Sequence, residues 1–138
     1  MSRRLAREVA FRALFQVDVG NSLPRLAVNY AAEGYSFSPE QMQFINELVH
    51  GTIEHKQAID EIIKKHLVKW ELKRISAVDR NLLRLALFEI LHRSDIPAAV
   101  SINEALELAK KYGSTPEAVA FINGLLDRVV GEALGRES

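Results

Sequence analysis

The hydrophobic residues of this chain recur with the three-to-four-residue spacing of α-helices, and no segment shows the alternation of a half-buried strand. The densest apolar run extends from Leu82 to Leu91, where eight of ten residues are apolar. A helix that is apolar almost all round must be surrounded by other helices. The pattern therefore predicts a central helix within Arg74–His92, with Ser76 as its N-cap and Asp79 at its third position.

Glu89 is one of two charged residues inside this apolar run. An unpaired carboxylate in a protein core is costly, so we expect a buried partner for it. This environment favours a structural ion pair over a catalytic role.

Six further segments have one apolar face and recognisable helix ends. Ser38 with Gln41 and Ser101 with Glu104 have the spacing of capping boxes, and Val100 is placed for a hydrophobic staple in front of the second. Proline and glycine residues mark other starts and stops. The expected segments are 3–19, 22–34, 38–53, 59–70, 101–113 and 115–135.

Seven helical segments without a strand pattern predict an all-α fold. We expect one domain made of two small packed helical bundles, about 1–73 and 74–138, which divide near Trp70–Ser76. A chain of 138 residues is long enough for a sizeable core.

Charge and composition narrow the function classes. Lysine plus arginine and aspartate plus glutamate both number 18, so the net charge is zero and any preference for nucleic acid must come from local clustering. Cysteine is absent, and the N-terminus lacks the apolar core of a signal peptide. No apolar run reaches membrane-spanning length. These features predict a cytoplasmic protein without membrane contact.

The sequence offers little support for catalysis. The four histidines are scattered without the i, i+4 spacing of a helical metal site, and no glycine-rich phosphate loop is present. We therefore predict no catalytic site, no metal and no cofactor, and expect that the protein is not an enzyme.

The N-terminus stands out as locally basic. Arg3, Arg4, Arg7 and Arg12 accompany Glu8 alone in the first twelve residues. The N-terminal end of a helix dipole is positive, so cations there are unfavourable. Three arginines within five residues at this end therefore favour a role in binding anions, because guanidinium groups bind phosphate bidentately. The nearby Phe11 and Phe15 offer platforms for unpaired bases. The alternative is an arginine-rich helix start with two core phenylalanines.

Ordered motifs along nearly the whole chain resemble the NusB family of bacterial transcription antitermination factors. These motifs are ARE-x-A-x-x-ALFQ near the start, followed by VDRNLLRLALFEIL, DIP, INEALELAKKYG and FINGLLDRV. The resemblance implies an all-helical protein of two bundles that binds the boxA element of nascent RNA with the ribosomal protein NusE. It further implies a place, beside other Nus factors and RNA polymerase, in complexes that support ribosomal RNA transcription.

The resemblance also implies roles for individual residues. The start of the central helix, Asp79 with Arg80, corresponds to the region that meets NusE, and we expect Asp79 to be exposed there. A core or capping role competes with each assignment, most strongly for Phe121 and Asp79. The implied RNA contacts are Arg3, Arg4, Arg7, Phe15, Tyr112, Phe121 and Asn123.

Three other functions compete with this reading. A NusB-like RNA-binding module could serve ribosome biogenesis without catalysis. The same helical domain also occurs fused to RNA cytosine methyltransferases, but these need a cofactor-binding domain and a cysteine nucleophile, and this chain has no cysteine. A helix-turn-helix DNA regulator needs a basic recognition helix. The segment Ile102–Tyr112 is acidic at its start, which argues against the DNA regulator.

Overall fold

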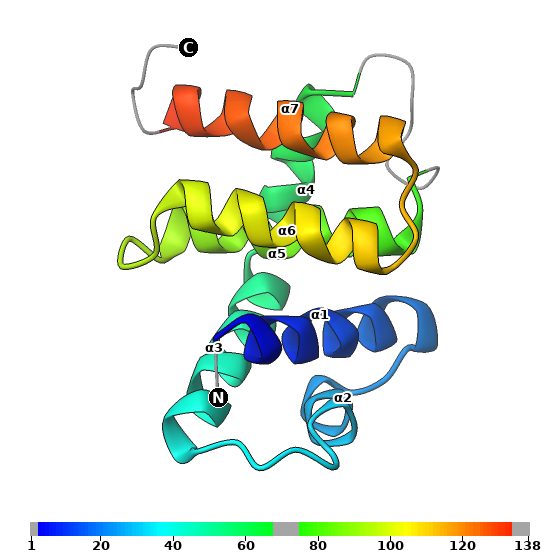
Figure 1. The fold of residues 1–138 in the computed structure, drawn as a ribbon, viewed down its shortest axis with the longest axis vertical. Helices are drawn as coiled ribbons and strands as arrows, with labels where there is room; N and C mark the ends of the chain where they lie inside the picture. Colours follow the sequence, from blue (N-terminus) through cyan, green and yellow to red (C-terminus); the bar gives the residue numbers. More distant parts are fainter. Residues whose placement is uncertain (1–2, 68–74, 134–138) are drawn as a thin grey trace. The chain divides into compact units, whose positions relative to one another are not determined.

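The computed structural model describes residues 3–67 and 75–133, and the regular structure within them is entirely helical (Figure 1). The all-α fold and the expected seven helices are therefore confirmed for the described residues. The helices are α1 (Arg3–Gly20), α2 (Pro24–Ala31), α3 (Pro39–Glu54), α4 (Lys56–Lys65), α5 (Ala77–His92), α6 (Ala98–Lys111) and α7 (Pro116–Ala133).

The chain forms two compact units, Met1–His55 and Lys56–Ser138. Helix α4 thus belongs to the second unit, together with the helix α5 that it contacts. The division expected from the sequence, near residue 73, falls within residues 68–74 and lies outside the described residues. The same holds for the predicted end of α4 at Trp70 and that of α7 at Gly135.

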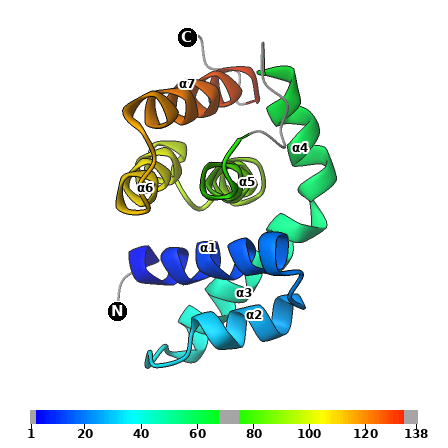
Figure 2. The ribbon, with the colours of Figure 1, turned by 90° about the vertical axis from the view of Figure 1, so that its right-hand side faces the viewer.

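The first unit is a three-helix bundle in which α1 packs against both α2 and α3 (Figure 2). The spacing of the sequence predicts a buried stripe of small side chains on α1, made of Ala6, Val9, Ala10, Ala13, Leu14 and Val17. All of them are buried except Val17, which is half-buried. Small side chains allow two helices to approach closely. The N–H of Ser22 donates to the carbonyl of Gln16 across the turn that ends α1.

The buried face of α3 differs from the stripe that the sequence spacing predicts, which is Met42, Ile45, Val49 and Ile53. Ile45 and Val49 are buried as expected, but Phe44 and Leu48 are buried in place of Met42 and Ile53, which are only partly covered. The helix is rotated so that its bulkiest apolar side chains point inward, since burying a phenylalanine or leucine side chain is worth about 1.5–3 kcal/mol.

Helix starts follow some local signals and not others. Ser38 and Gln41 form the predicted capping box, with side chain to backbone distances of 3.1 and 2.8 Å. The predicted capping box at Ser101 is wrong. Helix α6 begins earlier, with Pro97 as its N-cap, and the N–H groups of Val100 and Ser101 donate to the Pro97 carbonyl.

Helix α5 is the predicted central helix of the second unit and contacts α4, α6 and α7 (Figure 1). Every residue from Asn81 to Ile90 is buried, and the Oγ of Ser76 accepts the predicted capping bond from the N–H of Asp79 at 3.1 Å. The expected buried partner of Glu89 is confirmed as Ser101, whose hydroxyl donates to the carboxylate at 2.9 Å. Ser101 is therefore a core residue one turn inside α6.

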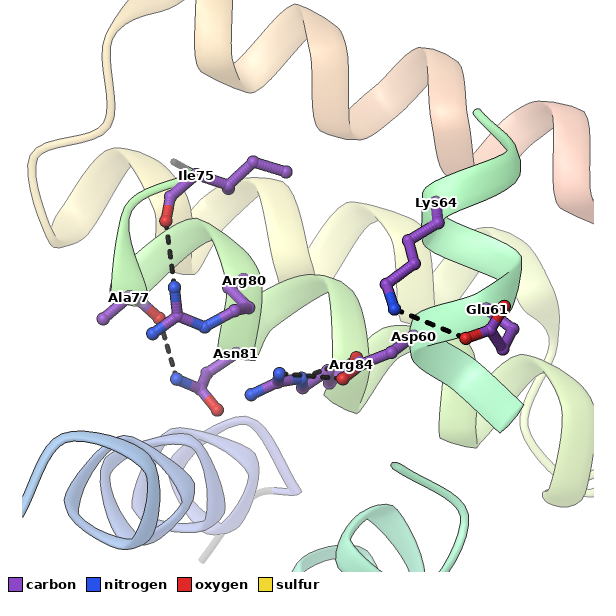
Figure 3. Close-up of polar contacts among 8 residues, drawn as sticks. All are labelled: Asp60, Glu61, Lys64, Ile75, Ala77, Arg80, Asn81 and Arg84. Atoms are coloured by element: carbon purple, nitrogen blue, oxygen red, sulfur yellow. Dashed lines mark hydrogen bonds and ion pairs between the residues drawn. The ribbon is translucent and has the colours of Figure 1, made fainter. Parts of the chain in front are cut away.

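A buried ion pair joins α4 to α5. The Nε and Nη2 atoms of Arg84 donate to the two carboxylate oxygens of Asp60 at 2.8 and 2.9 Å, and the side chains are only 7% and 14% exposed (Figure 3). This bidentate geometry satisfies both charges within the bundle. Among the helices of residues 3–67 and 75–133, none is long and apolar enough to cross a membrane.

Candidate nucleic-acid interface

The first turns of α1 carry the three arginines that the sequence singled out. Arg3 and Arg4 are exposed, whereas Arg7 is only 3% exposed. The first turn of α1 contains no acidic residue, so these guanidinium groups sit at the positive end of the helix dipole. A phosphate in solvent can therefore reach the two exposed arginines, whereas Arg7 is buried within the bundle.

Two of these arginines lie over the aromatic ring of Phe44 in α3. The guanidinium carbon of Arg3 lies 4.4 Å from the centroid of the Phe44 ring, and that of Arg7 lies 5.8 Å from it. Cations within about 6 Å of an aromatic face are attracted by its quadrupole. Phe44 therefore restrains the basic cluster. The sequence reading missed this residue because it lies on another helix, far along the chain from the arginines.

The two phenylalanines of α1 have different environments. Phe11 is a core residue at 1% exposure, and Phe15 is half-buried with its ring centroid 6.4 Å from that of Phe11 in an edge-on arrangement. Only Phe15 keeps part of its ring accessible, so it alone of the pair can stack on a base.

The second unit carries the remaining candidate RNA residues around the turn between α6 and α7. Tyr112 is the C-cap of α6 and half-buried, Phe121 of α7 is half-buried, and Asn123 is exposed. Each residue of a helix turns the side-chain direction by about 100°, so residues two apart point about 160° away from each other. Phe121 and Asn123 therefore face different directions, and a single strand cannot lie flat against both.

Asp79 is not the exposed acidic residue that the sequence led us to expect. It is only 8% exposed, and its Oδ1 accepts a hydrogen bond of 2.5 Å from the hydroxyl of Ser114 in the α6–α7 turn. Arg80 is half-buried, and its Nη1 donates to the carbonyl of Ile75 at 3.1 Å (Figure 3). The charge of Asp79 was visible in the sequence, but its partner comes from a turn 35 positions away.

A surface pocket of about 330 Å³ opens beside Asp79, between the beginnings of α5 and α7. Apolar and acidic residues both line it, and Phe121 is one of the apolar ones. The pocket is lined by Ile75, Ser76, Asp79, Thr115, Glu117, Ala118 and Phe121.

Comparison with known proteins finds relatives that match nearly the whole chain. The model of the NusB family matches residues 4–131. The chain is 49% identical over 130 residues to the transcription antitermination protein NusB of Desulforamulus reducens, covering 94% of this chain and 90% of that protein. It is 48% identical over 129 residues to the protein of the same name from Bacillus subtilis, covering 94% and 95%.

Solved structures agree with these sequence matches. The fold superimposes on T. maritima NusB with a TM-score of 0.88 at 36% identity, covering 96% of this chain and 92% of that one. It also superimposes on a chain in the crystal structure of antitermination factors NusB and NusE in complex with double-stranded RNA. That match has a TM-score of 0.85 at 27% identity and covers 94% and 96% of the two chains. By sequence along nearly its whole length and by fold, the chain belongs to the NusB family.

Proposed function

We propose that the protein is an RNA-binding transcription antitermination factor, which binds boxA RNA together with the ribosomal protein NusE. In this role it joins the elongation complex of RNA polymerase and other Nus factors and supports ribosomal RNA transcription. Family membership over residues 4–131 carries the proposal, and the likeness to a chain crystallised with NusE and RNA supports it. The protein acts in the cytoplasm, as a binding factor without catalytic activity.

Arg3 and Arg4 are the proposed phosphate contacts. Their exposed guanidinium groups project from the positive end of α1, and Phe44 restrains Arg3 before RNA arrives. A restrained side chain loses less conformational entropy when it binds. Arg7 contributes from below, because its guanidinium also lies over Phe44 and supports the same cluster.

Aromatic side chains are the proposed base contacts. Phe15, Tyr112 and Phe121 are each half-buried, which fixes the ring while part of it stays accessible for stacking. Asn123 is exposed and offers an amide to a base edge or the backbone from a different side of α7. The proposed contact region for NusE is the start of α5 around the half-buried Arg80, because Asp79 beside it is only 8% exposed and bonded to Ser114.

RNA titrations test this function directly. The measurement compares a boxA-like single-stranded RNA with a scrambled RNA of equal length, with and without NusE. We expect preference for the boxA-like RNA and a further gain with NusE. Equal affinity for the two RNAs under both conditions would refute the proposal.

Single arginine variants locate the interface. Arg3→Ala and Arg4→Ala should each weaken RNA binding and reduce the slope of log K against log salt by about 0.7 for a single strand. Arg25→Ala is the matched control, because Arg25 is an exposed arginine on α2 of the same unit. An identical response of all three variants would mean that α1 is not the RNA-binding surface.

A further inference from the structure

Three hydrogen bonds hold the turn between α6 and α7, two from backbone N–H groups and one from a side chain. Gly113 has a φ of +89°, and its N–H donates to the carbonyl of Lys110 at 3.2 Å. The N–H of Ser114 donates to the carbonyl of Ala109 at 2.9 Å, which closes the end of α6. The hydroxyl of Ser114 then reaches out of the turn to Asp79 of α5.

This turn carries candidate RNA contacts on both of its sides. Tyr112 immediately precedes it as the C-cap of α6. After it, the hydroxyl of Thr115 accepts from the N–H of Ala118 at 3.1 Å and starts α7, on which Phe121 follows within the next two turns. The placement of the turn against α5 therefore sets where both aromatic rings lie.

Asp79 is suited to fixing that placement. Its carboxylate is nearly buried, and a buried carboxylate without hydrogen bonds is strongly disfavoured. The hydroxyl of Ser114 satisfies one of its oxygens across elements that are far apart in sequence. Asp79 also lines the pocket to which Thr115, Ala118 and Phe121 contribute, so a shift of the turn would change this pocket as well.

We propose that Asp79 is a positioning residue, which holds the α6–α7 turn through Ser114 in the arrangement that presents Tyr112 and Phe121 to RNA. The inference rests on the proposed function, since it assumes that these rings meet RNA. It assigns the effect of Asp79 on RNA binding to the hydrogen bond with Ser114. A direct charge contact with NusE would not need Ser114 at all.

A double-mutant cycle measured without NusE separates the two roles. The variants are Asp79→Ala, Ser114→Ala and the double variant, and the readout is affinity for boxA-like RNA. Each single variant should weaken binding by about tenfold, comparable with the loss of one hydrogen bond to a charged group. The double variant should lose no more than either single variant, because both remove the same bond.

Conservative variants that retain the hydrogen bond between residues 79 and 114 should retain RNA binding. Asp79→Asn keeps an oxygen that can accept from Ser114, and Ser114→Thr keeps the hydroxyl, so both should bind RNA within about threefold of wild type. Ser94→Ala is the control, because Ser94 is an exposed serine in the α5–α6 loop. If Asp79→Ala does not fold, Ser114→Ala and Ser114→Thr carry the test, since Ser114 lies in a turn and is only partly buried.

Hydrogen exchange of the backbone amides of residues 112–115, 117 and 118 reports the stability of the turn independently of RNA. Ser114→Ala should accelerate exchange there, while Ser94→Ala should not. Wild-type RNA affinity and wild-type exchange in Ser114→Ala would overturn the positioning role even if the protein prefers boxA-like RNA. Weaker RNA binding by Asp79→Ala together with normal RNA binding by Ser114→Ala would also overturn it, because Asp79 would then act without Ser114. If the wild-type protein shows no RNA preference, the proposed function fails and the RNA role of the turn fails with it, whatever the exchange data show.

Discussion

Replacing Arg7 with alanine should affect folding and RNA binding together. Arg7 is 3% exposed and its guanidinium lies 5.8 Å from the Phe44 ring centroid. A desolvated cation over an aromatic ring contributes up to about 2 kcal/mol. Burial of the aliphatic stem of Arg7 stabilises the fold by a further amount of roughly 0.8 kcal/mol per methylene. Alanine also removes the cost of burying a charge, which offsets part of the stability that is lost. We expect a net loss of about 2 kcal/mol in the free energy of unfolding.

Thermal melts measure this loss. For a chain of this length a loss of 1 kcal/mol lowers Tm by about 3–5 °C, so Arg7→Ala should melt roughly 6–10 °C below wild type. Arg4→Ala should leave Tm unchanged because Arg4 is exposed, while its RNA salt slope falls. Melts and RNA titrations on the same two variants therefore separate the buried arginine from the exposed one.

Arg7→Met distinguishes packing from charge. Methionine keeps an unbranched apolar stem that can cover Phe44, but it carries no guanidinium. We expect it to regain most of the stability lost in Arg7→Ala without regaining RNA affinity. An Arg7→Ala protein that melts like wild type would refute the reasoning, because the contact with Phe44 would then contribute nothing measurable.

Three further expectations concern stacking, the core and partner coupling. Phe15→Ala and Phe121→Ala should each cost about 1–3 kcal/mol in RNA affinity; a loss of roughly 3–5 kcal/mol in unfolding free energy with normal RNA binding would instead identify a core residue. Arg84→Ala should destabilise the fold by roughly 3–5 kcal/mol because Asp60 is left charged and buried. Combining Arg84→Met with Asp60→Leu should recover most of that loss in denaturant titrations, and no recovery would contradict the account. NusE and boxA-like RNA should strengthen each other's binding by the same factor, measured by titration in both orders, and an RNA affinity that is the same with and without NusE would rule out cooperative binding.

Local sequence signals predicted helix ends correctly where the residues that cap the helix lie next to one another in the sequence. The Ser38–Gln41 capping box formed as expected, since both partners lie within one turn. The pattern at Ser101 and Glu104 has the same spacing but lies inside α6. Pro97 starts that helix one turn earlier, so the amide groups that Ser101 would cap are already bonded within the helix. Spacing alone does not reveal which of two possible turns comes first.

The candidate site was harder to predict, because exposure of a charged side chain depends on remote partners. Arg4 and Arg7 are both arginines in the first two turns of one amphipathic helix, yet one is exposed and the other buried over Phe44. Asp79 has the appearance of a surface capping residue until Ser114 is placed beside it. In both cases a side chain from a distant segment compensates the burial of a charge, and this compensation is a property of the tertiary packing. The sequence could therefore point to residues whose chemistry suits RNA or a protein partner. Whether each one touches a ligand or positions another residue follows only from the contacts, and the Ser114 and Arg7 variants test that distinction.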